Sequence, residues 1–275
     1  MRLPLPLAIF RLVLIMTCGL LPACATLPEP RLHAPVASEQ GAALLEEWLL
    51  RGGRSQTLQG VAKVRVQTPE RTLNGTQVLL AESPSRLRAE TLSPFGTSLL
   101  VMTVNDSELA VLAVGDNRFY RGRATPDNLA RFTRLPLRAT DLVGILLYRP
   151  PLVAYRTLET FRLDDGGWLL TLVDGDRRQE LQFDRERRLT GVRYLYGTEL
   201  QLRLGYGDFE TDPQRPPRRI ELELPLERIQ AELAFRELET GRQTAPGLFA
   251  LSPPAGALVT DLDDASSPAA REERQ

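Results

Sequence analysis

Along much of the chain, hydrophobic side chains recur at every second position. In residues 86–91, three charged side chains alternate with Leu87, Ala89 and Thr91, which predicts a strand with one wet and one dry face. Other stretches are more uniformly apolar but end at turn residues, which also indicates strands. The expected strands are antiparallel, number about eleven and lie in two blocks, residues 58–114 and 157–237.

Three segments have helical spacing instead. The spacing of Ala42, Leu45, Trp48 and Leu49 places them on one face of a helix, which Gly52-Gly53 ends. Two more helices are expected between the strand blocks, one starting at Thr125-Pro126 with the threonine as N-cap. The other starts at Thr140 and ends before Pro150. A sheet of this size curls, and with helices on one side it can enclose an apolar space.

Residues 1–23 have the layout of a bacterial secretion signal. Two arginines precede or flank an apolar run over 12–21 that is too short to span a bilayer. The following Leu21-Pro22-Ala23-Cys24 resembles the lipobox of lipoprotein signal peptides, in which the cysteine is alkylated and becomes the new N-terminus. We therefore expect Cys24 to carry the lipid. By the sorting rule of Gram-negative lipoproteins, Ala25 then favours the outer membrane.

The remaining chain divides into three parts by composition. Residues 24–40 are rich in Pro and Ala and aperiodic, which predicts a flexible tether. Residues 41–240 hold the expected strands and helices, without a repeat or a domain break. Residues 241–275 end in an acidic stretch that becomes rich in Ser, Pro and Ala, and we expect this C-terminal extension to be largely disordered.

Composition also argues against several kinds of chemistry. The formal net charge is -1, which gives no reason to expect nucleic-acid binding. Both cysteines lie within the first 24 residues and the only histidine is His33, so the folded body offers no disulfide, thiol nucleophile or metal-ligand cluster. No G-x-S-x-G motif is present. We expect a protein that is not an enzyme and that binds neither cofactor nor metal.

Three motifs, taken in order, resemble one family. The first is the strand 86–93, which ends in Pro94-Phe95-Gly96. The second is Leu135-Pro136-Leu137, followed by a helix, and the third is residues 206–222, with the character of a closing strand pair. Over residues 48–238 this order is similar to the LolB family of outer-membrane lipoproteins, in the LolA/LolB superfamily. Its members take lipoproteins from a periplasmic carrier.

The resemblance implies a fold and a function. The implied fold is mostly β, a half-open and strongly curled antiparallel β-barrel with a helical lid and a hydrophobic cavity. The implied function is an outer-membrane-anchored lipoprotein, facing the periplasm, that binds acyl chains and inserts lipoproteins or lipids into the membrane. Its partners would be membrane lipids, acyl chains and a LolA-like carrier, and we expect a monomer. The alternative is a structural or assembly lipoprotein of the cell envelope without lipid cargo.

Two sets of site residues follow. In the family, an apolar tip in the loop matching Pro94, Phe95 and Gly96 protrudes into solvent and is needed for membrane insertion. The alternative for Phe95 is a side chain tucked under neighbouring strands. Alternation along the strands gives a set of cavity candidates, each of which can also be ordinary core: Val78, Leu80, Leu87, Ala89, Leu99, Val101 and Leu146.

Overall fold

The structure is built on one large β-sheet. The computed structural model describes residues 32–52, 56–212, 215–245 and 247–264. Within them the sheet has 15 strands in the order β1-β8-β9-β10-β11-β12-β13-β14-β2-β3-β4-β5-β6-β7-β15. The strands are β1 Leu32–Val36, β2 Thr57–Gln67, β3 Thr72–Glu82, β4 Arg86–Leu92, β5 Ser98–Asn105, β6 Glu108–Ala113, β7 Arg118–Arg123, β8 Thr157–Leu163, β9 Trp168–Asp174, β10 Arg177–Phe183, β11 Leu189–Tyr196, β12 Glu199–Gly207, β13 Arg219–Leu224, β14 Ile229–Thr240 and β15 Leu258–Asp261. The helices are α2 Ser38–Gly52, α3 Pro126–Thr133 and α4 Ala139–Leu146.

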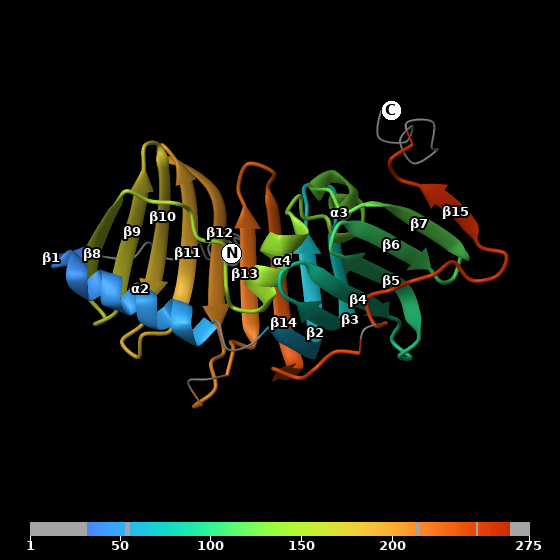
Figure 1. The fold of residues 1–275 in the computed structure, drawn as a ribbon, viewed down its shortest axis with the longest axis horizontal. Helices are drawn as coiled ribbons and strands as arrows, with labels where there is room; N and C mark the ends of the chain where they lie inside the picture. The colour runs from blue at the N-terminus through green and yellow to red at the C-terminus, as the bar shows by residue number, and fades with distance from the viewer. Residues whose placement is uncertain (1–31, 53–55, 213–214, 246, 265–275) are drawn as a thin grey trace, which may run out of the picture. The chain divides into compact units, whose positions relative to one another are not determined.

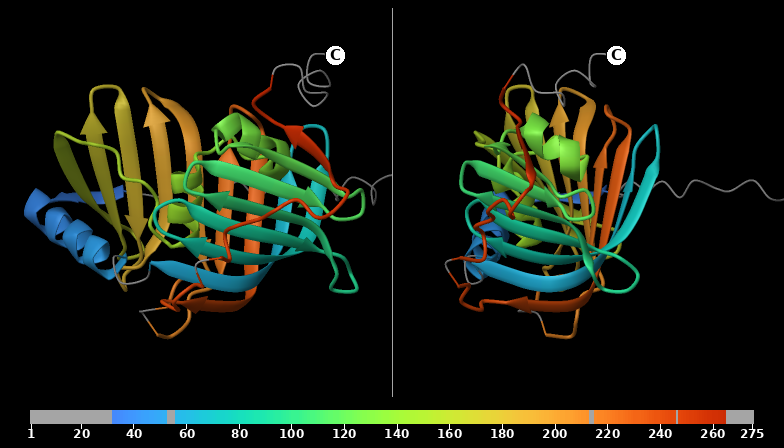
Figure 2. Two further views of the ribbon diagram at one scale, coloured as in Figure 1. Left: turned by 45° about the vertical axis from the view of Figure 1, so that its right-hand side comes forward. Right: turned by 90° about the vertical axis from the view of Figure 1, so that its right-hand side faces the viewer.

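The sheet consists of two meanders, β2–β7 and β8–β14, joined where β14 pairs with β2 (Figure 1). Every described strand pair is antiparallel except β15 with β7, which is parallel. The connection between the meanders carries α3 and α4. In Figure 2 the strands β4–β7 turn toward β8–β14, and α3 and α4 lie between them. The sheet therefore curls with the two helices on its concave side.

Along the concave face, apolar side chains that are paired across neighbouring strands form one continuous row. Leu170 lies opposite Leu181, Leu181 opposite Val192 and Val192 opposite Leu204. The row continues through Leu222 to β14 and β2. All these leucines and the valine belong to the main buried cluster, so this face holds the core, whose burial stabilises the fold.

The three predicted helices are present. Thr125 caps α3 as expected, because its hydroxyl accepts a hydrogen bond from the Asn128 amide at 3.2 Å. Helix α4 starts at Ala139, one residue before the predicted Thr140, and has no side-chain cap. Helix α2 starts at Ser38 and packs against β8. Gly41 of α2 permits this approach, since a Cβ there would collide with Thr160.

The prediction of about eleven strands is wrong, and the two strands at the sheet edges lie in segments expected to lack structure. β1 lies within the predicted tether 24–40, and α2 begins there too. β15 lies in the predicted C-terminal extension, while β7 follows the first predicted block. These strands are short or polar, and β1 contains a proline, so tertiary pairing rather than their own sequence pattern places them. The signal peptide 1–23, Cys24, residues 25–31 and residues 265–275 lie outside the described residues.

The segment 241–264, here called the C-terminal strap, is tied to β3–β7 and α3. Glu82 hydrogen-bonds Thr244, and Arg88 donates to the Leu248 carbonyl at 3.0 Å. Beyond β15, Asp263 accepts hydrogen bonds from the Arg123 amide at 2.8 Å and the Asn128 side chain at 2.9 Å. The expectation of disorder over 241–275 is therefore wrong for the described part of the strap.

Candidate functional site

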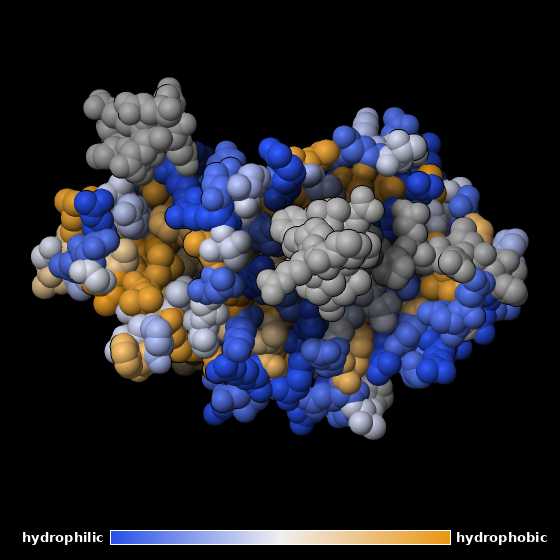
Figure 3. All heavy atoms as spheres, turned by 180° about the vertical axis from the view of Figure 1, so that it is seen from behind, coloured by the Kyte–Doolittle hydropathy of each residue, from blue (hydrophilic) through white to orange (hydrophobic). Residues whose placement is uncertain are grey.

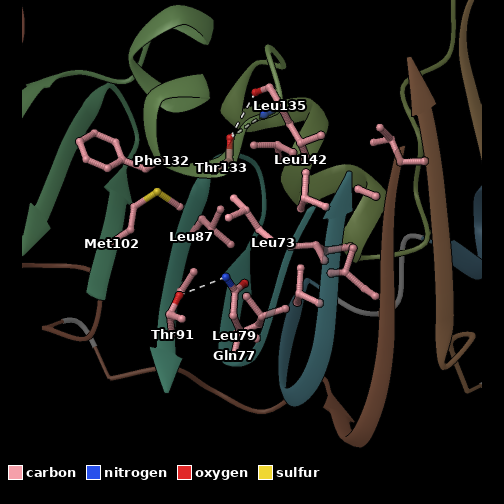
Figure 4. A pocket seen from close by; sticks show the side chains of 18 of the residues that line it. Leu73, Gln77, Leu79, Leu87, Thr91, Met102, Phe132, Thr133, Leu135 and Leu142 are labelled. Carbon is pink, nitrogen blue, oxygen red and sulfur yellow. Dashed lines mark hydrogen bonds between the residues drawn. The ribbon is translucent and has the colours of Figure 1, made fainter. Parts of the chain in front are cut away.

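A cavity of about 300 Å³ lies between the concave face of the sheet and the helices α3 and α4 (Figure 4). It has walls from β2–β5, from β13 and β14, and from the two helices with their connection. The main apolar lining residues are Val64, Val66, Leu73, Leu79, Leu87, Ala89, Leu100, Met102, Phe132, Leu135, Leu142, Ile145, Leu146, Ile220, Leu222, Ala231 and Leu233.

Among the polar side chains at the cavity, Gln77, Thr91 and Thr133 are hydrogen-bonded to the protein itself. Gln77 donates to the Thr91 hydroxyl at 3.2 Å, and the Thr133 hydroxyl donates to the Leu129 carbonyl at 2.8 Å. No described lining residue is charged. Such a surface offers little directional bonding to a ligand and favours apolar groups through burial.

The volume sets what the cavity can hold. An engineered apolar cavity of about 150 Å³ holds benzene, so about 300 Å³ has room for on the order of ten carbon atoms. This is at the lower end of the range for ligand pockets. The cavity suits a single alkyl chain better than a bulky ring system.

Three of the seven predicted cavity residues line it, namely Leu87, Ala89 and Leu146. The other four, Val78, Leu80, Leu99 and Val101, do not, and that part of the prediction is wrong. In β3 and β5 the register places Leu79 and Met102 beside Ala89, so their sequence neighbours point to the opposite face.

The error has an identifiable cause. Residues 78–81 and 99–102 are apolar at both odd and even positions, so alternation does not say which set faces inward. In β4 the inward-facing positions could be identified, because Leu87 and Ala89 alternate with charged residues. The short β3–β4 turn pairs Glu82 with Arg86 and Leu79 with Ala89. Because directly paired residues lie on the same face of a sheet, Leu79 faces inward like Ala89.

The segment that follows α4 is fastened to the sheet by buried polar groups. The hydroxyl of Tyr148 donates to the Leu189 carbonyl at 2.8 Å, and that of Tyr194 donates to the Pro151 carbonyl at 2.6 Å. The Gln179 amide also donates to Pro151, at 3.0 Å. Burial raises the pKa of both tyrosines well above its ordinary value, so both stay neutral donors. These bonds fix the C-terminal side of the helical cover.

The loop Pro94-Phe95-Gly96 protrudes from the β4–β5 hairpin. Phe95 is 94% exposed, so the interpretation of a tucked side chain is wrong. The Gly96 amide donates to the Ser93 carbonyl at 3.0 Å, and Gly96 has a φ of 83°, which glycine adopts without strain. Thr91 and Leu100, which line the cavity, lie only four or five residues from Phe95.

Other apolar side chains are exposed on β5 and beyond. Leu99 and Val114 are adjacent, since the Val114 amide donates to the Leu99 carbonyl at 3.0 Å, and both are exposed. Leu258 and Val259 of β15 are exposed as well. Seen from behind, apolar atoms gather at the end of the molecule that carries β7 and β15 (Figure 3).

Two features are absent from the described residues. These residues contain no helix that is long and apolar enough to cross a membrane. They also contain no group of three or more His, Cys, Asp or Glu side chains placed to hold a metal ion.

Comparison with solved structures identifies the fold. A domain described as an outer membrane lipoprotein-sorting protein, from Vibrio parahaemolyticus, aligns with a TM-score of 0.50 and 10% identity over 78% of this chain and 97% of that one. A DUF1329 family protein from Desulfovibrio piger aligns with a TM-score of 0.52 and 13% identity over the same shares. The chain therefore shares its fold with these two proteins.

A LolA superfamily protein from Nitrosomonas europaea aligns with a TM-score of 0.46 and 14% identity, over 75% of this chain and 97% of that one. No protein-family model and no curated protein sequence matches the chain. The similarity is therefore one of fold.

Proposed function

We propose that this chain is an outer-membrane lipoprotein that holds acyl chains in the cavity and passes lipids or lipoproteins to the membrane. The observation that carries the proposal is the uncharged apolar space under α3 and α4, which the protein's own side chains leave unfilled. That space also favours a carrier over the alternative, an envelope lipoprotein that acts as a platform without cargo.

Binding in this cavity would rest on burial of methylene groups. Each buried methylene contributes roughly 0.8 kcal/mol, and the cost of immobilising the chain offsets part of the sum. The loose shape requirement suits a protein that must release its cargo. Since no energy source acts here, transfer from a periplasmic LolA-like carrier through this protein to the membrane must follow a gradient of increasing affinity.

The proposal gives Cys24 and Phe95 separate roles. Acyl chains on Cys24 would hold the protein permanently at the membrane, because two or three chains bind far more strongly than one. Burying Phe95 in lipid would contribute only roughly 1.5–3 kcal/mol. This is small beside the anchor, but it is enough to turn the β4–β5 loop toward the bilayer.

Two adjacent substitutions in β5 test the cavity. In the mature chain with Cys24→Ser, Leu100→Trp places an indole in the cavity, whereas Leu99→Trp places it on the opposite face. We expect Leu100→Trp to weaken binding of a fluorescent fatty acid at least tenfold and Leu99→Trp to leave it unchanged. Thermal unfolding checks that both variants fold. Equal binding by folded Leu100→Trp and the parent would show that acyl chains do not use this cavity.

A further inference from the structure

Two hairpin turns meet at one end of the sheet. The β2–β3 turn spans residues 68–71 and the β13–β14 turn spans 225–228. Because Gln67 of β2 is paired with Gln230 of β14, these turns belong to neighbouring strands, which are spaced about 4.8 Å apart. The antiparallel order of β2, β3 and β4 places the Phe95 loop at the same end of the strands.

Three arginines lie around these turns, and they are here called the arginine rim. Arg71 lies in the first turn and Arg228 in the second, and both are exposed. Arg134 is the left-handed C-cap of α3, with a φ of 64°. It stands between Thr133 and Leu135, which both line the cavity.

Electrostatics connects two of these arginines to the first turn. The pKa of Glu70 is lowered mainly by the Thr68 hydroxyl, which donates to its carboxylate at 2.7 Å, and next by a backbone hydrogen bond. Arg228 and Arg134 lower it further through Coulombic attraction. Both guanidinium groups therefore lie within electrostatic reach of Glu70, although they come from different elements.

The rim and its two turns carry an excess of positive charge. Within the described part of the chain, neither Arg71 nor Arg134 nor Arg228 forms an ion pair. Glu70 and Glu227 are the acidic residues of the two turns, so three arginines face two carboxylates. On the outer face of the sheet, by contrast, arginines are paired across strands, as in Arg203 with Glu223 at 3.4 Å.

The rim borders the cavity. Val66 and Leu73, which line it, are each two residues from the first turn, and Ala231 is three residues from Arg228. Two or three residues of extended strand span roughly 7–10 Å. An alkyl chain lying in the cavity would therefore place a polar group attached to its outer end near the guanidinium groups.

We propose that the arginine rim binds the anionic phosphate headgroup of a lipid whose acyl chain occupies the cavity. This inference rests on the proposed function and names its substrate class. Guanidinium groups suit phosphate oxygens because their N–H donors form a planar fork that bonds two oxygens at once. The rim is largely exposed, so salt weakens this attraction more than it weakens acyl burial.

The test compares two single-chain lipids of one chain length in the mature Cys24→Ser protein. Lysophosphatidylglycerol carries an anionic phosphate and a monoacylglycerol carries neither phosphate nor charge, and each displaces a fluorescent fatty acid from the cavity. We expect the anionic lipid to compete about tenfold better, and this preference to disappear in Arg134→Gln/Arg228→Gln. Affinity for the monoacylglycerol should stay the same, because the cavity is unchanged and this lipid has no phosphate.

Arg65→Gln is the matched control. Like each substitution of the double variant, it removes one positive charge, but Arg65 alternates with Val64 and Val66, which line the cavity, so it lies on the opposite face of β2. Its preference should equal that of the parent. An equal loss in Arg65→Gln, or no preference in the parent, overturns the headgroup assignment while acyl binding stands.

Inorganic phosphate separates a lipid site from a free-anion site. We expect millimolar phosphate to leave the preference in place once ionic strength is matched with chloride. If phosphate abolishes it at the concentrations at which the lysolipid binds, the rim is a free-anion site and the headgroup assignment is wrong. If the parent binds no fatty acid at all, the proposed function fails first.

Discussion

The two meanders of the sheet use their concave faces differently. Over β8–β11 the face is filled, since α2 has 15 residues and its Trp48 meets Phe183 of β10 edge to face, with ring centroids 6.3 Å apart. Over β2–β5 the cover consists of α3 and α4, with 8 residues each, and the cavity remains beneath them. One curled sheet therefore packs as core in one half and leaves an apolar cavity in the other.

The largest effect is expected in the filled half. Trp48→Ala removes a buried side chain from a packed environment, and we expect a loss of about 3–5 kcal/mol in the free energy of unfolding. Urea denaturation measures it. Leu49→Ala, one residue further along α2 and exposed, should change stability by less than about 0.5 kcal/mol. A small effect of Trp48→Ala would show that this half is not tightly packed.

Two alanines on the concave face allow a direct comparison of the packed core with the cavity. Ala81 is fully buried and does not line the cavity, whereas Ala89 does. Ala81→Leu should overpack the core and cost about 1–3 kcal/mol. Ala89→Leu extends into free space, so we expect little loss of stability but weaker binding of the fluorescent fatty acid. Equal destabilisation by both variants, measured by urea denaturation, would mean that the cavity is closed in solution.

A substitution in the C-terminal strap is expected to change the free energy of unfolding by a smaller amount, which depends on pH. The backbone amide of Arg123, followed by other groups including Asn128, lowers the pKa of Asp263 below its ordinary value of 3.8. A lowered folded-state pKa stabilises the fold above the unfolded value, and this contribution is lost as pH falls through the folded value. We expect Asp263→Asn to cost about 0.5–1.5 kcal/mol at pH 7.

The difference between Asp263→Asn and the parent should shrink in unfolding experiments below about pH 4. A difference that stays constant from pH 7 to pH 3 would contradict a role for the ionised carboxylate in holding the strap to α3.

The smallest effect on stability is expected for a substitution in the exposed β4–β5 loop. Phe95→Glu alters an exposed side chain, so the free energy of unfolding should change by less than about 0.5 kcal/mol. Transfer of a fluorescent lipid to vesicles should nevertheless slow, because a carboxylate resists entry into the bilayer. Tyr196→Glu, exposed at the β11–β12 hairpin of the other meander, is the control. Unchanged transfer by Phe95→Glu would remove the membrane-facing role of the loop.

Part of the site could be predicted from the sequence. Leu87 and Ala89 line the cavity because charged neighbours fix which side of β4 faces inward, whereas the exposed tip at Phe95 was implied by the family resemblance and not by its neighbouring proline and glycine. The inward-facing residues of β3 and β5 could not be identified, because apolar residues occupy both the odd and the even positions of these strands. The arginine rim was not foreseen, since Arg71, Arg134 and Arg228 come from three separated turns and only the pairing of β14 with β2 and the path of α3 bring them together.

By itself the sequence determined a β-rich chain with two helices inserted between two strand blocks, because strand alternation, Thr125 capping and proline stops act over a few residues. The tertiary structure alone decided the pairing of β14 with β2, the recruitment of β1 and β15 to the sheet edges and the size of the space under α3 and α4. These features depend on contacts between residues far apart in the chain, whose free energy no local pattern records.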